Sequence, residues 1–164
     1  MSRQDAIRQL PIFKKAEAIV RLTEGLVALF PEENELLQSI KGMMYGDALL
    51  IPAKIVGAEA GDLYDLRMEN AAIIRKAARE LYVNAGSLKY HGIDNTEYAN
   101  LLRKEIDDFR YLFIDWVAGF DQNNYIRDDW GLFNPPGILA LKKGEVDDDD
   151  FDIDDRNDFD DEEE

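Results

Sequence analysis

The chain contains few side chains of the kinds that catalyse reactions or bind metal ions. It has no cysteine and a single histidine, His91, which precedes Gly92 in a predicted loop. Nucleophilic catalysis needs an activated nucleophile beside a base, and no serine is placed to pair with His91. A di-iron site in a helical protein needs Glu-x-x-His pairs on two helices, which one histidine cannot supply. The residue types therefore predict a protein that is not an enzyme and that holds no cofactor and no metal ion.

The charge of the chain is divided unevenly. Its 164 residues include 19 Lys and Arg and 35 Asp and Glu, for a net charge of −16. Residues 146–164 hold 13 of the acids and one arginine, so they carry −12 and leave −4 for residues 1–145. A segment with so few apolar residues cannot form a core, so we expect a disordered polyacidic tail. Because Phe151, Ile153 and Phe159 punctuate its acids, the tail either docks on a basic surface or only keeps the protein soluble.

Two groups of basic side chains are candidates for contact with a polyanion or a partner. One group is Arg75, Lys76 and Arg79, and the other is Arg103 and Arg110. Acidic residues stand beside the second group, and an ordinary solvated helix face is the better interpretation of both groups. A net charge of −4 over residues 1–145 also differs from the strongly basic balance of a general phosphate binder.

Four long helices are predicted to position these side chains. Apolar residues recur at alternating steps of three and four, the period of a buried helix face, over residues 12–30, 63–88 and 99–120. A fourth, less regular segment runs from about residue 33 to 60. Because the connections are short, residues 1–120 predict an all-α fold, an antiparallel up-down four-helix bundle.

The irregular segment contains Gly42, Gly46 and Pro52. The two glycines lie one helical turn apart, so they let a neighbouring helix approach closely. The simplest interpretation is tight packing within the bundle itself, and the alternative is a ligand-binding role.

The last predicted helix and the residues after it carry more apolar surface than one bundle seam uses. Residues 121–145 are too apolar for a flexible linker, and Pro135-Pro136 favours an extended chain, so we expect an ordered arm lying across the bundle or a neighbouring subunit. Surplus apolar surface of this kind usually marks an interface. The candidate oligomer-interface residues are Phe113, Trp116, Val117, Phe120, Trp130 and Phe133.

The sequence also bears on location. No apolar run approaches the ~20 residues that span a membrane, and no signal-peptide core follows Met1. We therefore expect a cytoplasmic protein that does not contact a membrane.

Several segments are similar to one known family of helical proteins. These segments are Phe13–Ala16, Leu22-Thr23, Phe30-Pro31, Leu50–Ile55 with its internal proline, Ala78–Leu81 and Phe109–Phe120. Over about residues 12–120 the chain resembles the four-helix-bundle family encoded in intervening sequences of large-subunit rRNA genes. It is also similar to the accessory variability determinant proteins of diversity-generating retroelements. The resemblance implies a homo-oligomer, typically a pentameric barrel of bundles, and in the retroelement branch the binding of a reverse transcriptase and nucleic acid.

Two functions follow as hypotheses. The first is a non-enzymatic, oligomeric scaffold or adaptor that binds a protein or ribonucleoprotein partner. The alternative is a nucleic-acid-binding accessory protein of a reverse transcriptase. Salt-dependent retention on nucleic acid separates them, because contacts with phosphates release counterions.

Overall fold

The structure, a computed structural model of the chain, describes residues 1–94 and 96–146. Its α-helices are α1 (Arg3–Gln9), α2 (Pro11–Val27), α3 (Glu35–Ala60), α4 (Tyr64–Ser87) and α5 (Thr96–Ala118), and a short 3₁₀ helix, η1 (Leu88–His91), follows α4. No β-strand occurs in the described residues, so the predicted all-α class is confirmed for them. The predicted tail, apart from Val146, lies outside the described residues.

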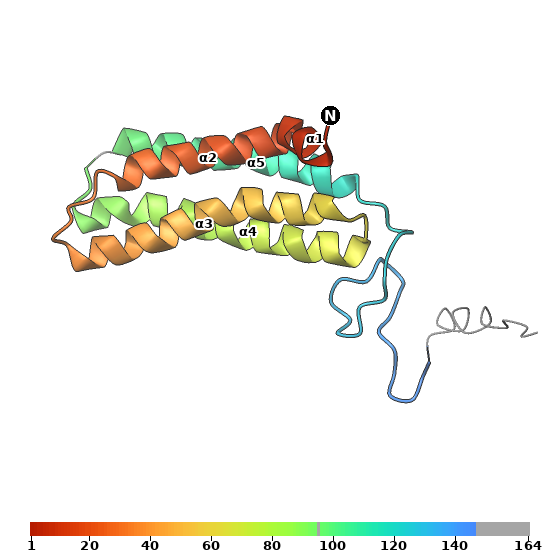
Figure 1. The fold of residues 1–164 in the computed structure, drawn as a ribbon. Coiled ribbons are helices and arrows are strands. Elements are labelled where there is room, and N and C mark those ends of the chain that lie inside the picture. The colour runs from red at the N-terminus through yellow and green to blue at the C-terminus, as the bar shows by residue number, and fades with distance from the viewer. Residues whose placement is uncertain (95, 147–164) are drawn as a thin grey trace, which may run out of the picture.

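The four long helices lie side by side, with α2 next to α5 and α3 next to α4 (Figure 1). Helix α2 packs against α3 and α5, and α4 packs against the same two helices. One continuous apolar core lies between them, and it includes Ile19, Ile51, Ile74 and Leu102, each fully buried. We refer to residues 3–118 as the helical body.

The apolar stripes predicted for the first and last long helices face this core. In α2 the buried residues include Ile12, Ala16, Ile19 and Leu26, and Thr23 lies among them. The Thr23 hydroxyl donates a 2.8 Å hydrogen bond to the carbonyl oxygen of Ile19, four residues earlier. The one polar side chain of the stripe is therefore satisfied within its own helix, as a buried hydroxyl requires.

Helix α1 was not predicted, because seven residues are too few to show a helical period. Ser2 caps it in a capping box with Asp5, in which each residue's side chain accepts a hydrogen bond from the other's backbone N–H. The hydrogen bond from Ser2 lowers the pKa of the Asp5 carboxyl. The Arg3 guanidinium donates to the carbonyl oxygen of Glu59, with the shorter N···O distance at 2.6 Å, and this contact holds α1 against the end of α3.

Helix α3 is one continuous helix of 26 residues, although Pro52 stands inside it. Asn34 caps its first turn by accepting a 3.0 Å hydrogen bond from the N–H of Leu37. Proline removes one backbone donor from the helix, and the neighbouring Ile51 and Ile55 are fully buried. Burial of apolar side chains on both sides of Pro52 compensates for the missing hydrogen bond.

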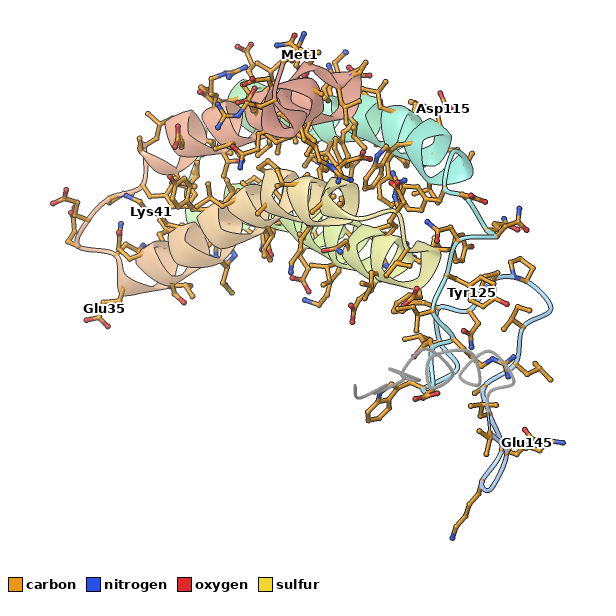
Figure 2. The ribbon with its side chains drawn as sticks, turned by 45° about the vertical axis from the view of Figure 1, so that its right-hand side comes forward. Met1, Glu35, Lys41, Asp115, Tyr125 and Glu145 are labelled. Atoms are coloured by element: carbon orange, nitrogen blue, oxygen red, sulfur yellow. The ribbon has the colours of Figure 1, made fainter. Side chains whose placement is uncertain are left out.

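The apolar arm, residues 121–145, is irregular and contacts the helical body only near its start. The N–H of Tyr64 donates to the carbonyl oxygen of Asn124 (2.8 Å), and the N–H of Ile126 donates to the Asp65 carboxylate (3.2 Å). After Tyr125 the chain turns away from the helices, and Glu145 lies far from them (Figure 2). One of the two expectations was that the arm lies across its own helical body, and it does not. The next hydrogen bonds along the arm join residues of the arm to each other and form a loop.

This loop is held together by two side chains of the arm. The Asp128 carboxylate accepts hydrogen bonds from the N–H groups of Trp130, Leu132 and Phe133, at 2.8 to 3.0 Å. Asn134 pairs with the backbone of Asp128 as both acceptor (2.7 Å) and donor (3.0 Å). The arm is therefore ordered by its own polar contacts, and Trp130 remains 94% exposed.

In the described part of the chain, no helix combines the length and the apolar character needed to cross a membrane.

Candidate functional site

A groove of about 410 Å³ lies between α4 and α5. Residues on one side of each helix line it. From α4 come Arg75, Ala78, Arg79, Tyr82 and Val83, and from α5 come Ile106, Asp107, Phe109, Arg110, Phe113 and Ile114. We call this feature the α4–α5 groove.

The floor of the α4–α5 groove is apolar because it is the edge of the core. Ala78, Ile106 and Phe109 are 8%, 6% and 2% exposed, so they pack inward and offer only their outer surface to the groove. Ala78 is the small residue among them, and its short side chain makes room between the two helices. The lips are apolar too, since Val83 is 65% exposed and Ile114 is 54% exposed. Exposed apolar surface next to a hollow is typical of a binding site.

The rim of the groove is cationic. Arg75 and Arg79 stand one turn apart on α4, and Arg110 stands on α5. In residues 1–94 and 96–146 no carboxylate forms an ion pair with any of these three guanidinium groups. Arg110 instead lies over the ring of Tyr111, 5.2 Å from its centroid. The groove therefore combines an apolar floor with three arginines that lack an acidic partner there, and Asp107 is the acid in its lining.

The structure brings together only part of the predicted basic set. Arg75, Arg79 and Arg110 share the groove, whereas Lys76 lines a second hollow on α4 with Arg75, Arg79 and Glu80, and it pairs with Glu80 at 2.6 Å. The hydrogen bond from this lysine to Glu80 raises the pKa of Lys76. Arg103 lies over the ring of Tyr82 at 4.1 Å from its centroid. Stacking holds Arg103 against the helical body rather than at the rim.

The predicted interface residues on α5 and just after it are used largely within the chain. Phe120 is 5% exposed and packs in a second small cluster with Tyr64 and Ala71 of α4. Phe113, Trp116 and Val117 are half-buried against the same cluster. These apolar side chains of α5 and Phe120 thus pack against the start of α4. Phe120 is buried there and is not available to a partner.

The two other predicted interface residues stand on the arm. Trp130 is exposed and Phe133 is half-buried in the loop around Asp128. Of the six predicted interface residues, Trp130 is therefore the one left most exposed, and their role in an oligomer stays a prediction.

A second exposed apolar surface lies on α3. Its members are side chains that the core does not use: Leu36 (57% exposed), Met43 (52%), Tyr45 (37%), Leu49 (42%), Leu50 (38%) and Val56 (37%). By helical spacing they form two stripes, Leu36, Met43 and Leu50 on one side of Gly42 and Gly46, and Tyr45, Leu49 and Val56 on the other. The residues of the first stripe follow one another at intervals of seven. We call these six residues the α3 face.

Gly42 and Gly46 correct an expectation from the sequence. A β-carbon built on either glycine has no atom outside its own helix within 4 Å, so neither position packs against the helical body. Their small size is not explained by contacts within the chain. Sequence reasoning missed the α3 face because α3 is apolar on most sides, so its pattern does not distinguish the core side from the outer side.

His91 is half-buried at the end of η1, and Gly92 after it has φ 79°, in the left-handed region. Across the described ranges, no three Asp, Glu or His side chains are grouped in a way that would hold a metal ion.

Comparisons with known protein families, with curated proteins and with solved structures found no match to the chain.

Proposed function

We propose that the protein is a non-enzymatic, oligomeric scaffold of the cytoplasm that binds a protein or ribonucleoprotein partner. In this proposal the four long helices form an antiparallel up-down bundle, and copies of the chain associate through the α3 face. The α4–α5 groove and the arm then remain available to a partner. The observation that carries the proposal is the α3 face.

The α3 face has the properties of a helix-docking surface. Its six side chains are uncharged, and each leaves more than a third of its surface in water. A stripe at seven-residue spacing allows one helix to pack along a second helix. Gly42 and Gly46 would let that second helix come close.

A second copy of the chain is the partner that fits this surface best. An apolar stripe is complementary to itself, because its leucine and methionine side chains can pack against their copies in a second chain. Closed, self-complementary contacts of this kind are the commonest way in which identical chains associate. We therefore assign the α3 face to self-association rather than to the external partner.

The test is sedimentation velocity of the full chain at tens of micromolar, where association corresponds to about 6–7 kcal/mol. Wild type should sediment as an oligomer, and Met43→Glu/Leu50→Glu should be monomeric, because two buried carboxylates would lack partners. Leu101→Glu is the control, since Leu101 is a similarly exposed leucine (48%) on α5. A monomeric wild type, or a double variant that sediments like wild type with unchanged helix content, would refute the proposal.

The second candidate is a nucleic-acid-binding accessory protein of a reverse transcriptase. It is favoured by the gathering of Arg75, Arg79 and Arg110 at one groove. Titration of the full chain with RNA at two salt concentrations tests it, since each phosphate contact steepens the salt dependence. Binding that weakens with salt and is lost in Arg75→Glu/Arg79→Glu would place this candidate first.

A further inference from the structure

The α4–α5 groove has the surface of a binding site for an acidic segment with apolar side chains. Its floor and lips are apolar, and its three rim arginines have no carboxylate partner in the described residues. A guanidinium group forms its strongest hydrogen bonds with carboxylates. A ligand that places one aromatic ring on the floor and carboxylates on either side would satisfy both parts of the groove.

Residues 147–164 of the same chain have this composition. They contain 13 acids against one arginine. Each of the two aromatic residues stands between aspartates, Phe151 between Asp150 and Asp152, and Phe159 between Asp158 and Asp160. The acids therefore lie on both sides of each ring, as the arrangement of the rim around the floor requires.

The segment can reach the groove from its attachment point. The arm is tied to Asp65 at the start of α4, and Arg75 lies ten residues further along that helix, which is about 15 Å at 1.5 Å per residue. Beyond Asn134 the hydrogen bonds of the described arm join only close neighbours in sequence. From Glu145 at the end of the ordered arm, a fully extended chain reaches about 20–22 Å to Phe151 and about 46–50 Å to Phe159. The reach to Phe159 is about three times the distance from Asp65 to Arg75, so the length of the chain permits docking without movement of the helical body.

Attachment to the same chain also favours binding. A segment joined by a short flexible linker is present at an effective concentration near millimolar. Even a weak contact between the segment and the groove is therefore largely occupied.

We propose that residues 147–164 dock in the α4–α5 groove of their own chain, with Phe151 or Phe159 on the apolar floor and the neighbouring aspartates at Arg75, Arg79 and Arg110. The docked segment closes the groove to other acidic segments and to polyanions. Another ligand then binds in the groove only by displacing residues 147–164. This inference concerns the groove alone and does not depend on self-association through the α3 face.

The absence of cysteine in the chain permits a direct test by disulfide crosslinking of the full-length protein. The reporting pair is Ile114→Cys on the lip of the groove with Ile153→Cys, which leaves both phenylalanines in place. The control pair is Lys14→Cys with Ile153→Cys. Lys14 is exposed on α2, and its neighbour Lys15 pairs with Glu105 of α5 at 2.7 Å, so it lies at the level of the groove.

We expect the reporting pair to form a disulfide within one chain at least about tenfold faster than the control pair, the ratio that about 1.4 kcal/mol of docking produces. The advantage should disappear when Arg79→Glu or Arg110→Glu is added, and also when Phe151→Ser/Phe159→Ser is added. Circular dichroism checks that each variant keeps its helix content. The inference is overturned by equal rates for the two pairs, by an advantage that persists in Arg79→Glu, or by disulfides that join only separate copies.

Discussion

At the scale of single residues, the indole of Trp116 connects three helices. Its Nε1 donates a 2.7 Å hydrogen bond to the Glu59 carboxylate at the end of α3, and Arg67 of α4 donates to the same oxygen at 2.6 Å. The Arg67 guanidinium lies 4.1 Å from the centroid of the Phe120 ring, and this ring meets Trp116 edge-on at 4.8 Å. Removal of the indole therefore affects an ion pair and an aromatic contact together.

We predict that Trp116→Ala lowers the free energy of unfolding by about 3–5 kcal/mol, as truncation of a large packed aromatic does. Trp116→Phe should cost only about 1 kcal/mol, because a phenyl ring takes the place of the indole and one hydrogen bond is removed. Arg67 still pairs with Glu59 in this variant. Urea denaturation of the two variants measures both values. A loss below about 1 kcal/mol for Trp116→Ala would mean that the indole carries little of the packing at this end of the helices.

Asp128 has a comparable role in the arm. Its carboxylate accepts three backbone N–H groups, and the hydrogen bond from Phe133 is the largest cause that lowers the pKa of this carboxyl, with Leu132 and Trp130 acting in the same direction against the effect of burial. A carboxyl with a depressed pKa in the folded state contributes stability above its unfolded pKa, and this contribution is lost as the pH falls through the folded value.

We therefore predict that the loop of the arm persists as the pH falls through the ordinary Asp range near 4 and opens only below it. The amide chemical shifts of Leu132 and Phe133 report the transition by NMR. In Asp128→Asn the same amides should indicate an open loop at every pH, because a neutral amide accepts weaker hydrogen bonds. Titration of both amides within the ordinary range would contradict the prediction.

At the scale of helices, glycines in α2 and α3 have different roles. A β-carbon on Gly25 of α2 would collide with the hydroxyl of Tyr98 on α5, so glycine leaves room there for the end of the tyrosine side chain. A β-carbon on Gly46 of α3 would meet no neighbouring helix or side chain within 4 Å. A helix-interior glycine with no packing role costs about 0.5–1 kcal/mol relative to alanine.

Gly46→Ala should therefore stabilise the isolated chain by about 0.5–1 kcal/mol and at the same time weaken self-association, because the added methyl group lies beside the α3 face. Thermal denaturation of dilute protein and sedimentation of concentrated protein measure the two effects. Gly25→Ala serves as the contrast and should be destabilising in both assays. If Gly46→Ala leaves the oligomer unchanged, the close approach of two α3 helices at this glycine is excluded.

At the scale of the whole molecule, charge and apolar surface are separated along the chain. Residues 1–145 are close to neutral and build the helical body and the arm, and residues 146–164 carry −12 of the net −16. The arginines of the α4–α5 groove, which have no carboxylate partner among residues 1–94 and 96–146, lie on the nearly neutral part. Attraction between the two parts is screened over ~8 Å at physiological salt, so it acts only where the acidic segment reaches the rim.

The sequence by itself determined the helical class, the long helices to within a few residues, and the buried stripes of α2 and α5, because a period of 3.6 residues can be read directly from apolar spacing. It did not reveal α1, which is shorter than two such periods and depends on the cap at Ser2 and on Arg3 reaching Glu59.

Only the tertiary structure decided which apolar surfaces are left over. A wide stripe on α5 suggested a subunit contact. The start of α4 covers part of it and buries Phe120, while Leu101 and Ile114 stay exposed. In α3 the apolar residues surround the helix, so the pattern could not show that Leu36, Met43 and Leu50 face outward. Nor could it show that Arg110 joins Arg75 and Arg79. Amphipathic spacing fixes which residues share one face of a helix, whereas the neighbour that covers this face is set by how the helices pack in space.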